Sequence, residues 1–370
     1  MFRRIASAWL AAWLGVIAAP VLLLAVGEEE KEPASKSVTV ESADFLKLPP
    51  GLERTNFIVA KTAPKVDVCF FAGLKDRGKG TLYSSWGDGC IASNGKYYTS
   101  VGDHFGIDAN SYVYEYDPVT MILRRVVDVL RAIGHMLGMY GHGKIHSGIH
   151  EAADGKLYFA TYWGKPKEVD AAFTKGFEGS LLLCYDPKNG KTSTLLDGYR
   201  YTNGVCIAHD GQSLFFAESW ACRVHRYWFD GPKAGRVECV IRDMPGYPDN
   251  INRASDGGYW MAWLGMRTPS FDLALRHPGM RKRMTRRLPQ DDWLFPNINT
   301  GGVVKFDETG RIREALGDLT GNAHPMVTSM REHKGYLYVG GILNNRIGRY
   351  RIPGADSNWT GMRSYWGGRP

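Results

Sequence analysis

The sequence lacks the closely spaced cysteine pairs of zinc and redox sites. Its 370 residues include six cysteines, all far apart, and no C-x-x-C pair. This spacing argues against a structural zinc or a dithiol redox motif. Several cysteines stand inside apolar strand patterns, such as Cys184 in Leu182-Leu183-Cys184-Tyr185, where a small buried thiol is expected. We therefore predict at most one disulfide.

The patterns of nucleic-acid-binding proteins are also missing. Lys and Arg outnumber Asp and Glu by 46 to 38, which gives a formal net charge of +8. The basic residues are spread widely, however, and no aromatic-basic module accompanies them. We expect no nucleic-acid partner.

Long helical patterns are scarce, and short apolar runs take their place. The chain is 44% hydrophobic and 23% charged, which allows a large core and excludes a disordered or fibrous protein. Its 44 glycines and 18 prolines separate many short apolar runs, as expected of an all-β fold with frequent tight turns.

The first residues predict a targeting segment rather than part of the fold. Arg3 and Arg4 precede an uncharged apolar stretch at residues 5–27, whose length matches the roughly 20 residues needed to span a bilayer. A cleaved signal peptide, which usually has a shorter apolar core, is the alternative. We predict a signal anchor or signal peptide at 1–27, a linker at 28–42 and a folded domain at 43–370. The domain is then membrane-anchored through the N-terminal helix, or secreted, and lies outside the cytosol.

One pattern recurs along the chain: a polar residue, a DG, NG or KG turn, and an apolar-aromatic strand. Its copies start near residues 88, 147, 203, 249 and 328, and the longest interval holds an insertion at about 269–296. A period of about 50 residues is typical of β-propeller blades. Residues 45–87 are long enough for most of another blade or for a closing strand. We therefore predict an all-β, six-bladed β-propeller with an N-terminal membrane-anchor or signal helix.

Polar residues with side-chain oxygens open two successive repeats. Asn203 precedes one apolar strand, and Asp249 and Asn250 precede the next, 46 residues later. In a propeller such side chains converge on the central axis, and carboxylate and amide oxygens are ligands that Ca²⁺ accepts. The alternative is that these residues merely cap turns, as Asn and Asp commonly do.

Several motifs resemble those of the strictosidine synthase-like family, and above all its adipocyte plasma membrane-associated protein branch. That branch is similar also in its N-terminal anchor and its basic insertion. The resemblance is specific from about residue 180 to 352 and weak before 143. The motifs are Asn203-Gly204-Val205, Ala217-Glu218-Ser219, Arg226-Tyr227-Trp228, Pro245-Gly246-Tyr247-Pro248-Asp249-Asn250-Ile251, Gly257-Gly258-Tyr259-Trp260 and Glu332-His333-Lys334-Gly335-Tyr336-Leu337-Tyr338.

More distantly, the pattern is similar to the paraoxonases and the gluconolactonase/regucalcin group, which are six-bladed propellers that hold calcium in the central channel and hydrolyse lactones or esters. This resemblance implies further ligands. The first-blade ligand, a Glu in a G-P-E pattern, falls on Asp88, and the third-blade Asn falls on Ser147. Ser147 is a departure, because a serine hydroxyl ligates calcium only weakly. With Asn203, Asp249 and Asn250 these residues make up the predicted metal set.

Catalysis departs from strictosidine synthases proper, which use a glutamate in the last blade. The matching position is Thr328, which cannot exchange a proton near neutral pH as a carboxylate can, so alkaloid condensation is not expected. Histidine is the other proton carrier: His146 immediately precedes an inner strand, and His324 precedes the last blade. A metal that polarises a carbonyl and a histidine that activates water are the minimum parts of a lactonase.

The histidines have two other interpretations. His146 lies in a Gly-rich segment that also contains His135, His142 and His150. These side chains are either structural histidines of a loop or ligands of a transition metal, since imidazole suits zinc, manganese and iron.

The insertion at about 269–296 mixes apolar residues with basic ones. On an anchored protein such a segment either lies on anionic lipid or forms a lid that selects apolar substrates. The alternative is a solvated helix packed on the flank of the propeller.

Two functions follow from the sequence. One is a calcium-dependent hydrolase of lactones or aryl esters, with a small-molecule substrate. The other is a non-enzymatic propeller that binds a ligand or partner, which the loss of the family glutamate at Thr328 and the change at Ser147 favour. Fold alone does not decide between them.

Overall fold

The computed structural model describes residues 33–46, 62–63, 65–74, 89–102, 110–134, 141–164, 173–176, 179–289, 292–293, 300–318, 326–341 and 348–361. The predicted anchor at 1–27 and the candidate residues Asp88 and His324 lie outside the described residues. In the part that the structure describes, no helix is long and apolar enough to cross a bilayer. Residues 33–370 form one compact unit.

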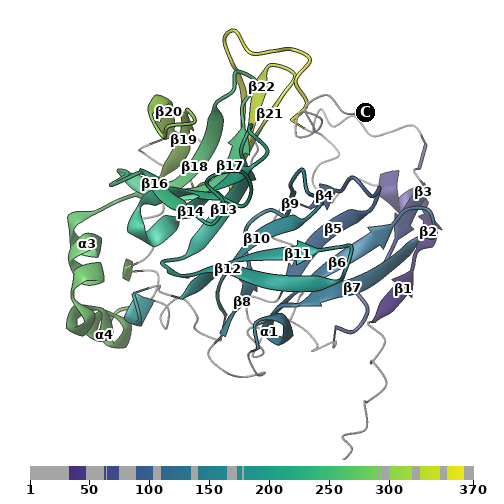
Figure 1. Cartoon of the computed structure of the whole chain (residues 1–370), viewed down its shortest axis with the longest axis horizontal. Helices are drawn as coiled ribbons and strands as arrows, with labels where there is room; N and C mark the ends of the chain where they lie inside the picture. The colour runs from purple at the N-terminus through teal and green to yellow at the C-terminus, as the bar shows by residue number, and fades with distance from the viewer. Residues whose placement is uncertain are drawn as a thin grey trace, which may run out of the picture. The chain divides into compact units, whose positions relative to one another are not determined.

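The described residues are built mainly from antiparallel meanders (Figure 1). Two sheets have five strands each, in the orders β1-β7-β6-β5-β4 and β12-β11-β10-β8, with β9 also paired to β10. Their strands are β1 (Ala34–Lys36), β4 (Cys90–Ile91), β5 (Tyr97–Gly102), β6 (Ser111–Asp117), β7 (Ile122–Asp128), β8 (Gly141–Ile145), β9 (His150–Glu151), β10 (Leu157–Gly164), β11 (Ser180–Asp186) and β12 (Lys191–Tyr199).

The later sheets follow the chain strand by strand. The third is β13-β14-β15-β16, the fourth β17-β18-β19-β20 and the fifth β21-β22-β23, while β2 and β3 form a separate pair. Their strands are β2 (Val38–Glu41), β3 (Lys65–Val68), β13 (Thr202–Ile207), β14 (Ser213–Glu218), β15 (Arg223–Trp228), β16 (Val237–Ile241), β17 (Gly246–Arg253), β18 (Tyr259–Met266), β19 (Gly301–Phe306), β20 (Ile312–Asp318), β21 (Val327–His333), β22 (Tyr336–Gly341) and β23 (Gly348–Arg351).

Short helices connect some of these strands. The insertion of the fourth sheet carries two of them between β18 and β19. The helices are η1 (Ala43–Leu46), α1 (Val129–Ala132), η2 (Ser219–Ala221), α3 (Pro269–Arg276) and α4 (Pro278–Arg287).

Each of the five predicted repeats coincides with one of the five meander sheets. Successive sheets are neighbours, since β13 contacts β9 and β10 of the second sheet and β17 of the fourth, and β17 contacts β21 of the fifth. The mostly β architecture is therefore as predicted. The count of six blades stays a prediction, because residues 47–61 and 75–88 lie outside the described ranges.

The hairpin turns explain why the repeats are visible in the sequence. In the first four sheets an Asn or Asp side chain accepts a hydrogen bond of 2.9–3.2 Å from the backbone N–H two residues later. The residue between is a glycine with φ between 67° and 84°, a left-handed conformation that side chains disfavour. The turns are Asn94-Gly95, Asp154-Gly155, Asp210-Gly211 and Asp256-Gly257.

Apolar side chains fill the space between successive sheets. One cluster joins the second and third sheets through Tyr158 and Phe216, and another joins the fourth and fifth through Trp260 and Leu337. A further cluster packs the third sheet, the fourth sheet and α3 together, with Phe271 of α3 at 1% exposure. The six cysteines are all free thiols.

The structure differs from the prediction at the linker. Residues 34–41, placed in the predicted linker at 28–42, form β1 and β2, which pair with β7 and β3. The segment Val38-Thr39-Val40 is β-branched throughout, a composition that favours strands.

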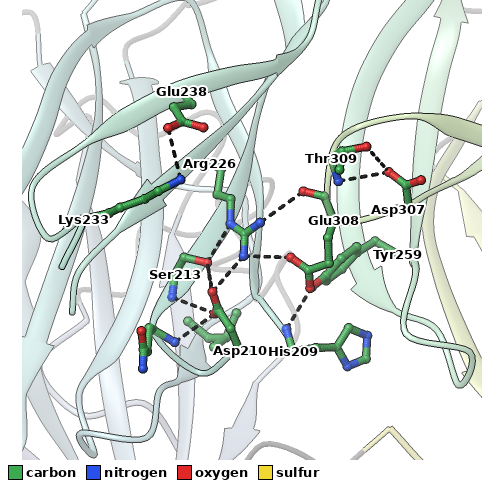
Figure 2. A network of polar contacts seen from close by, with 12 residues as sticks. His209, Asp210, Ser213, Arg226, Lys233, Glu238, Tyr259, Asp307, Glu308 and Thr309 are labelled. Carbon is green, nitrogen blue, oxygen red and sulfur yellow. Dashed lines mark hydrogen bonds and ion pairs between the residues drawn. The ribbon is translucent and has the colours of Figure 1, made fainter. Parts of the chain in front are cut away.

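Arg226 of β15 fastens the third sheet to the fourth, as Figure 2 shows. Its Nη2 lies 2.7 Å from Asp210 Oδ2 of its own sheet and 2.7 Å from Glu308 Oε2 in the turn between β19 and β20. Its Nη1 donates to the backbone oxygen of Glu308 at 3.1 Å, and the guanidinium lies over the rings of Phe215 and Trp228. One cation thus satisfies groups from two sheets.

Replacing Arg226 with alanine is expected to lower the free energy of unfolding by about 3 kcal/mol, the lower end of the cost of breaking a buried ion pair, because water still reaches the two acids. Urea denaturation measures the change. The matched control is Arg313→Ala, which removes the more exposed Arg313–Asp307 bridge and is expected to cost under about 1 kcal/mol. Equal midpoints for both variants would contradict the role of Arg226.

Candidate metal site

Gly204 brings two strands into direct contact. A Cβ added at Gly204 would lie 2.4 Å from the backbone oxygen of Asp249 and 2.5 Å from the Cα of Asn250. Only a residue without a side chain allows β13 and β17 to approach this closely. The neighbouring Asn203 and the carboxylate of Asp249 are therefore side by side, although 46 residues separate them in the chain.

Asp249 is a buried carboxyl group with few partners. It is 6% exposed, and burial raises its pKa to about 8, although hydrogen bonds from the Asn250 backbone N–H and the Asn203 side chain lower it. Removal of a charged group from water disfavours the ionised form unless an opposite charge lies nearby. The carboxyl group at this position therefore requires a proton or a cation.

Asn203 supplies the second unusual atom of the site. Its side chain is 4% exposed, and its Oδ1 is buried without a hydrogen-bond donor among the described residues. Leaving a buried acceptor without a partner costs about 1–3 kcal/mol. A hard cation beside the Asp249 carboxylate satisfies both groups, so the donor set fits calcium.

Asn250 links the site to the fifth sheet. Its Nδ2 donates to the backbone oxygen of Thr328 at 2.8 Å and to Asp249 Oδ1 at 3.1 Å. Two residues further along β17, Asn252 makes the same kind of bond to the backbone oxygen of Met330. Because the amide nitrogen of Asn250 is engaged in this way, its Oδ1 is the atom left for a ligand.

Ser147 has a partner within its own sheet. Its buried Oγ accepts a hydrogen bond of 2.8 Å from the backbone N–H of Ala160 in β10. Among the described residues, Ser147 makes no hydrogen bond to Asn203 or Asp249. The structure thus brings together three of the five predicted metal residues, while Ser147 is occupied in the second sheet and Asp88 is not described.

His146 stands among tyrosines. Its Nδ1 lies 3.5 Å from the Tyr201 hydroxyl, and its ring packs edge-on against Tyr162 with centroids 4.3 Å apart. Tyr201 has a left-handed backbone with φ of 63°, an uncommon conformation that is often found at functional sites. Since Tyr201 comes two residues before Asn203, His146 and the metal candidates belong to the same end of the inner strands.

A row of aromatic rings extends from His146 to the insertion, and the sequence analysis did not single it out. Tyr162 packs on Tyr201, and Trp220 of η2 packs on both Tyr201 and Phe271 of α3. Each ring belongs to a different element, so no local pattern identifies the row. Its one local signal is the polar motif at Asn203, which directly follows Tyr201.

A buried contact between a glutamate and a histidine lies at the same end of the third sheet. His225 Nε2 lies 2.8 Å from Glu218 Oε2, and both side chains are less than 10% exposed. Burial acts to raise the pKa of Glu218, but hydrogen bonds from His225 and from the Arg200 backbone N–H hold it below its usual range. Glu218 is therefore ionised at neutral pH and serves to hold His225.

The group formed by Asn203, Asp249 and Asn250 differs chemically from a transition-metal site. Within the described ranges, no three His, Cys, Asp or Glu side chains gather in a way that would hold a metal ion. The site built here offers one carboxylate and two amides. Amide and carboxylate oxygens suit calcium rather than zinc or copper.

One family model covers the strands that carry this site. The family model described as SMP-30/Gluconolactonase/LRE-like region matches residues 150–274, a segment that contains Asn203, Asp249 and Asn250. A luciferin-regenerating enzyme is among the similar solved structures, with a TM-score of 0.47 and 14% identity over 73% of this chain and 78% of its own.

Two curated groups of relatives match as well. The adipocyte plasma membrane-associated protein of Gallus gallus is 32% identical over 205 residues, which is 53% of this chain and 49% of the relative. The strictosidine synthase-like 10 protein of Arabidopsis thaliana is 31% identical over 176 residues, which is 46% of each chain. The matched region thus spans about half the length of these relatives. The predicted resemblance to strictosidine synthase-like proteins and to their adipocyte plasma membrane-associated branch is confirmed.

Proposed function

We propose that the protein is a calcium-dependent hydrolase of lactones or aryl esters. The observation that carries the proposal is the buried pair formed by the Asp249 carboxyl group and the Asn203 Oδ1 atom, because among the described residues no cation offsets the burial of the carboxyl group and no donor reaches the amide oxygen. The match to a region named after gluconolactonase supports this substrate class. Strictosidine synthase activity is not part of the proposal, because Thr328 stands where that chemistry uses a glutamate.

In this proposal, the metal-binding residues and His146 have separate roles. Asn203, Asp249 and Asn250 hold the ion, and the backbone oxygen of Thr328 keeps Asn250 in place. When bound, calcium supplies positive charge that polarises the substrate carbonyl. His146 takes a proton from the attacking water at a ring nitrogen and returns it to the oxygen of the departing alcohol.

The aromatic row favours apolar substrates. Tyr201 is half-buried and lies beside His146, while Tyr162 and Trp220, at 3% and 7% exposure, pack against it from the core. Aryl groups and alkyl chains pack well against such rings. The insertion therefore contributes to substrate selection through Phe271, which holds Trp220 from behind.

A non-enzymatic binding protein is the second candidate. The hydrogen bond between the Ser147 hydroxyl and the Ala160 backbone favours it, since it occupies a residue that the resemblance assigns to the metal. A propeller with a calcium ion and an aromatic surface can bind a ligand without turnover.

We place the domain outside the cytosol, anchored to a membrane or secreted. The apolar residues 5–27 support this location, and so does the name of the adipocyte plasma membrane-associated relatives. Calcium is abundant there, which suits an ion held by a single carboxylate.

Activity is expected to depend on the metal and on Asp249. In the purified full chain, excess chelator or Asp249→Ala should lower kcat/KM for lactones and aryl esters by about 100-fold or more, whereas exposed Asp197→Ala serves as the matched control and should keep the wild-type rate. Turnover measured with and without calcium tests this. Calcium-dependent melting without any turnover would favour the binding protein instead.

His146→Gln separates catalysis from metal binding. Loss of a general base typically costs about 100-fold to 10,000-fold in rate, so kcat should fall while the rise in melting temperature caused by calcium stays at the wild-type value. Steady-state kinetics and thermal melts on the same samples provide both readouts. An unchanged kcat would remove His146 from the mechanism.

The raised pKa of Asp249 makes stability depend on pH. Without calcium, the folded state keeps the proton up to pH of about 8 while the unfolded chain releases it near pH 4. The contribution of this group to the free energy of unfolding is therefore most favourable below pH 4. It falls by a few kcal/mol as the pH rises towards 8.

Asp249→Asn should flatten this dependence and make the metal-free chain more stable than wild type at pH 8, with Asp197→Asn again as the control. Calcium should reverse the order, because it binds the ionised carboxylate of the wild type and stabilises it more as pH rises. Melts at pH 5 and pH 8 with chelator or calcium measure both effects. A wild type whose metal-free stability does not change with pH would contradict the assignment.

A further inference from the structure

The two helices of the insertion pack against the fold on one side and are exposed to solvent on the other. Phe271 and Ala274 of α3 are buried, and Met280 and Met284 of α4 pack against the same apolar cluster. Figure 1 shows both helices at one edge of the compact unit, outside the sheets. The side of α4 that faces the protein is thus already occupied by the fold.

Arg281 is the single cation of α4 that faces inwards. It is 6% exposed, and it donates to the backbone oxygens of Ala274, at 3.1 Å, and Leu275. Its Nε donates to the backbone oxygen of Thr174 at 3.4 Å. These bonds fix α4 against the end of α3 and against the turn at residues 173–176.

The remaining cations face outwards. Lys282, Arg283, Arg286 and Arg287 occupy positions i, i+1, i+4 and i+5, which share one side of a helix, and Arg276 ends α3 nearby in the chain. All five are exposed, and α4 contains no acidic residue. We call these five residues the basic face.

No acid of the described residues neutralises the basic face. The ion pairs of other arginines and lysines are with acids elsewhere, and Asp272 of α3, which precedes Arg276 by one helical turn, is held by Arg267 at 2.8 Å. Two large apolar side chains stand beside these charges, Leu273 at 49% and Leu288 at 44% exposure. Unpaired cations flanked by exposed leucines match a surface with negative headgroups above an apolar layer.

We propose that the basic face, with Leu273 and Leu288, is a docking surface for a bilayer that contains anionic phospholipid. The cations meet the headgroups and the leucines reach the layer below. An acidic protein or a nucleic acid would use the charges but leave the exposed leucines without a function. The inference does not depend on the proposed hydrolase activity.

Local protection from trypsin tests the contact in the full chain. Cleavage after Lys282, Arg283, Arg286 and Arg287 is followed by mass spectrometry with vesicles of neutral phosphatidylcholine or with vesicles that contain about 30% phosphatidylserine. Slower cleavage at these sites is expected with the anionic vesicles alone and should disappear in 0.5 M salt, where the Debye length falls to about 4 Å. An apolar segment such as residues 5–27 would interact with both lipids alike, so it would not produce this difference.

A charge-neutralised variant gives the second readout. Lys282, Arg283, Arg286 and Arg287 are changed to glutamine, which keeps helix propensity, and the control changes the exposed Lys188, Lys191, Arg242 and Arg311 in the same way. Co-flotation measures how much better each protein binds anionic than neutral vesicles. Each lost charge near the membrane should reduce this preference about fivefold, while the control keeps it.

Three results would overturn the proposal. One is equal cleavage of α4 with both kinds of vesicle in the wild type. Another is an unchanged lipid preference in a glutamine variant whose melting temperature matches the wild type. The third is protection of α4 by heparin but not by anionic vesicles, which would assign the basic face to a soluble polyanion.

Discussion

The contact between β13 and β17 at Gly204 is the constraint on which the site depends. The backbone of Asp249 occupies the space that a Cβ atom at Gly204 would fill. The two strands therefore place an amide oxygen and a carboxyl group together where both are almost entirely removed from solvent. The unusual protonation of Asp249 and the orphaned oxygen of Asn203 both follow from this packing.

Hydrogen bonds around this contact prevent the site from relaxing. The Ser219 hydroxyl donates to the backbone oxygen of Pro248 at 2.6 Å, directly before Asp249. On the other side Asn250 is held by the backbone of β21. A buried carboxyl group normally escapes its desolvation by moving towards solvent, and here the backbone on both sides is fixed. This rigidity is what preorganisation requires of a binding site.

Much of the fold could be predicted from the sequence because it is encoded locally. An Asp or Asn followed by glycine forms the same turn in four sheets, and the apolar run after each turn forms the next strand. The pairing of Asn203 with Asp249 was predictable for the same reason, since both occupy the same place in consecutive repeats. Regular repetition converts sequence position into spatial position.

The rest depends on contacts between sheets that no local pattern contains. The bond from Ala160 of β10 reaches Ser147 in the segment between β8 and β9, and the tyrosines around His146 come from β10 and from the residue before β13. The strands in the predicted linker were missed because each needs a partner far along the chain, β7 at one end and β3 at the other. Arg281 and its neighbours in α4 are alike in sequence, and tertiary packing alone separates the buried cation from the exposed ones.

The Thr202 hydroxyl donates to the backbone oxygens of Thr161 at 2.9 Å and Leu181 at 3.1 Å. These bonds connect the first strand of the third sheet to the second sheet. The next residue along the chain is Asn203. The position of its amide group therefore depends on strands of the second sheet that contribute no residue to the pair formed by Asn203 and Asp249. Small shifts of β10 or β11 would move the amide oxygen towards or away from the Asp249 carboxyl group. The spacing between these two groups thus depends on packing in the second sheet, which a comparison of Asn203 and Asp249 alone would not reveal.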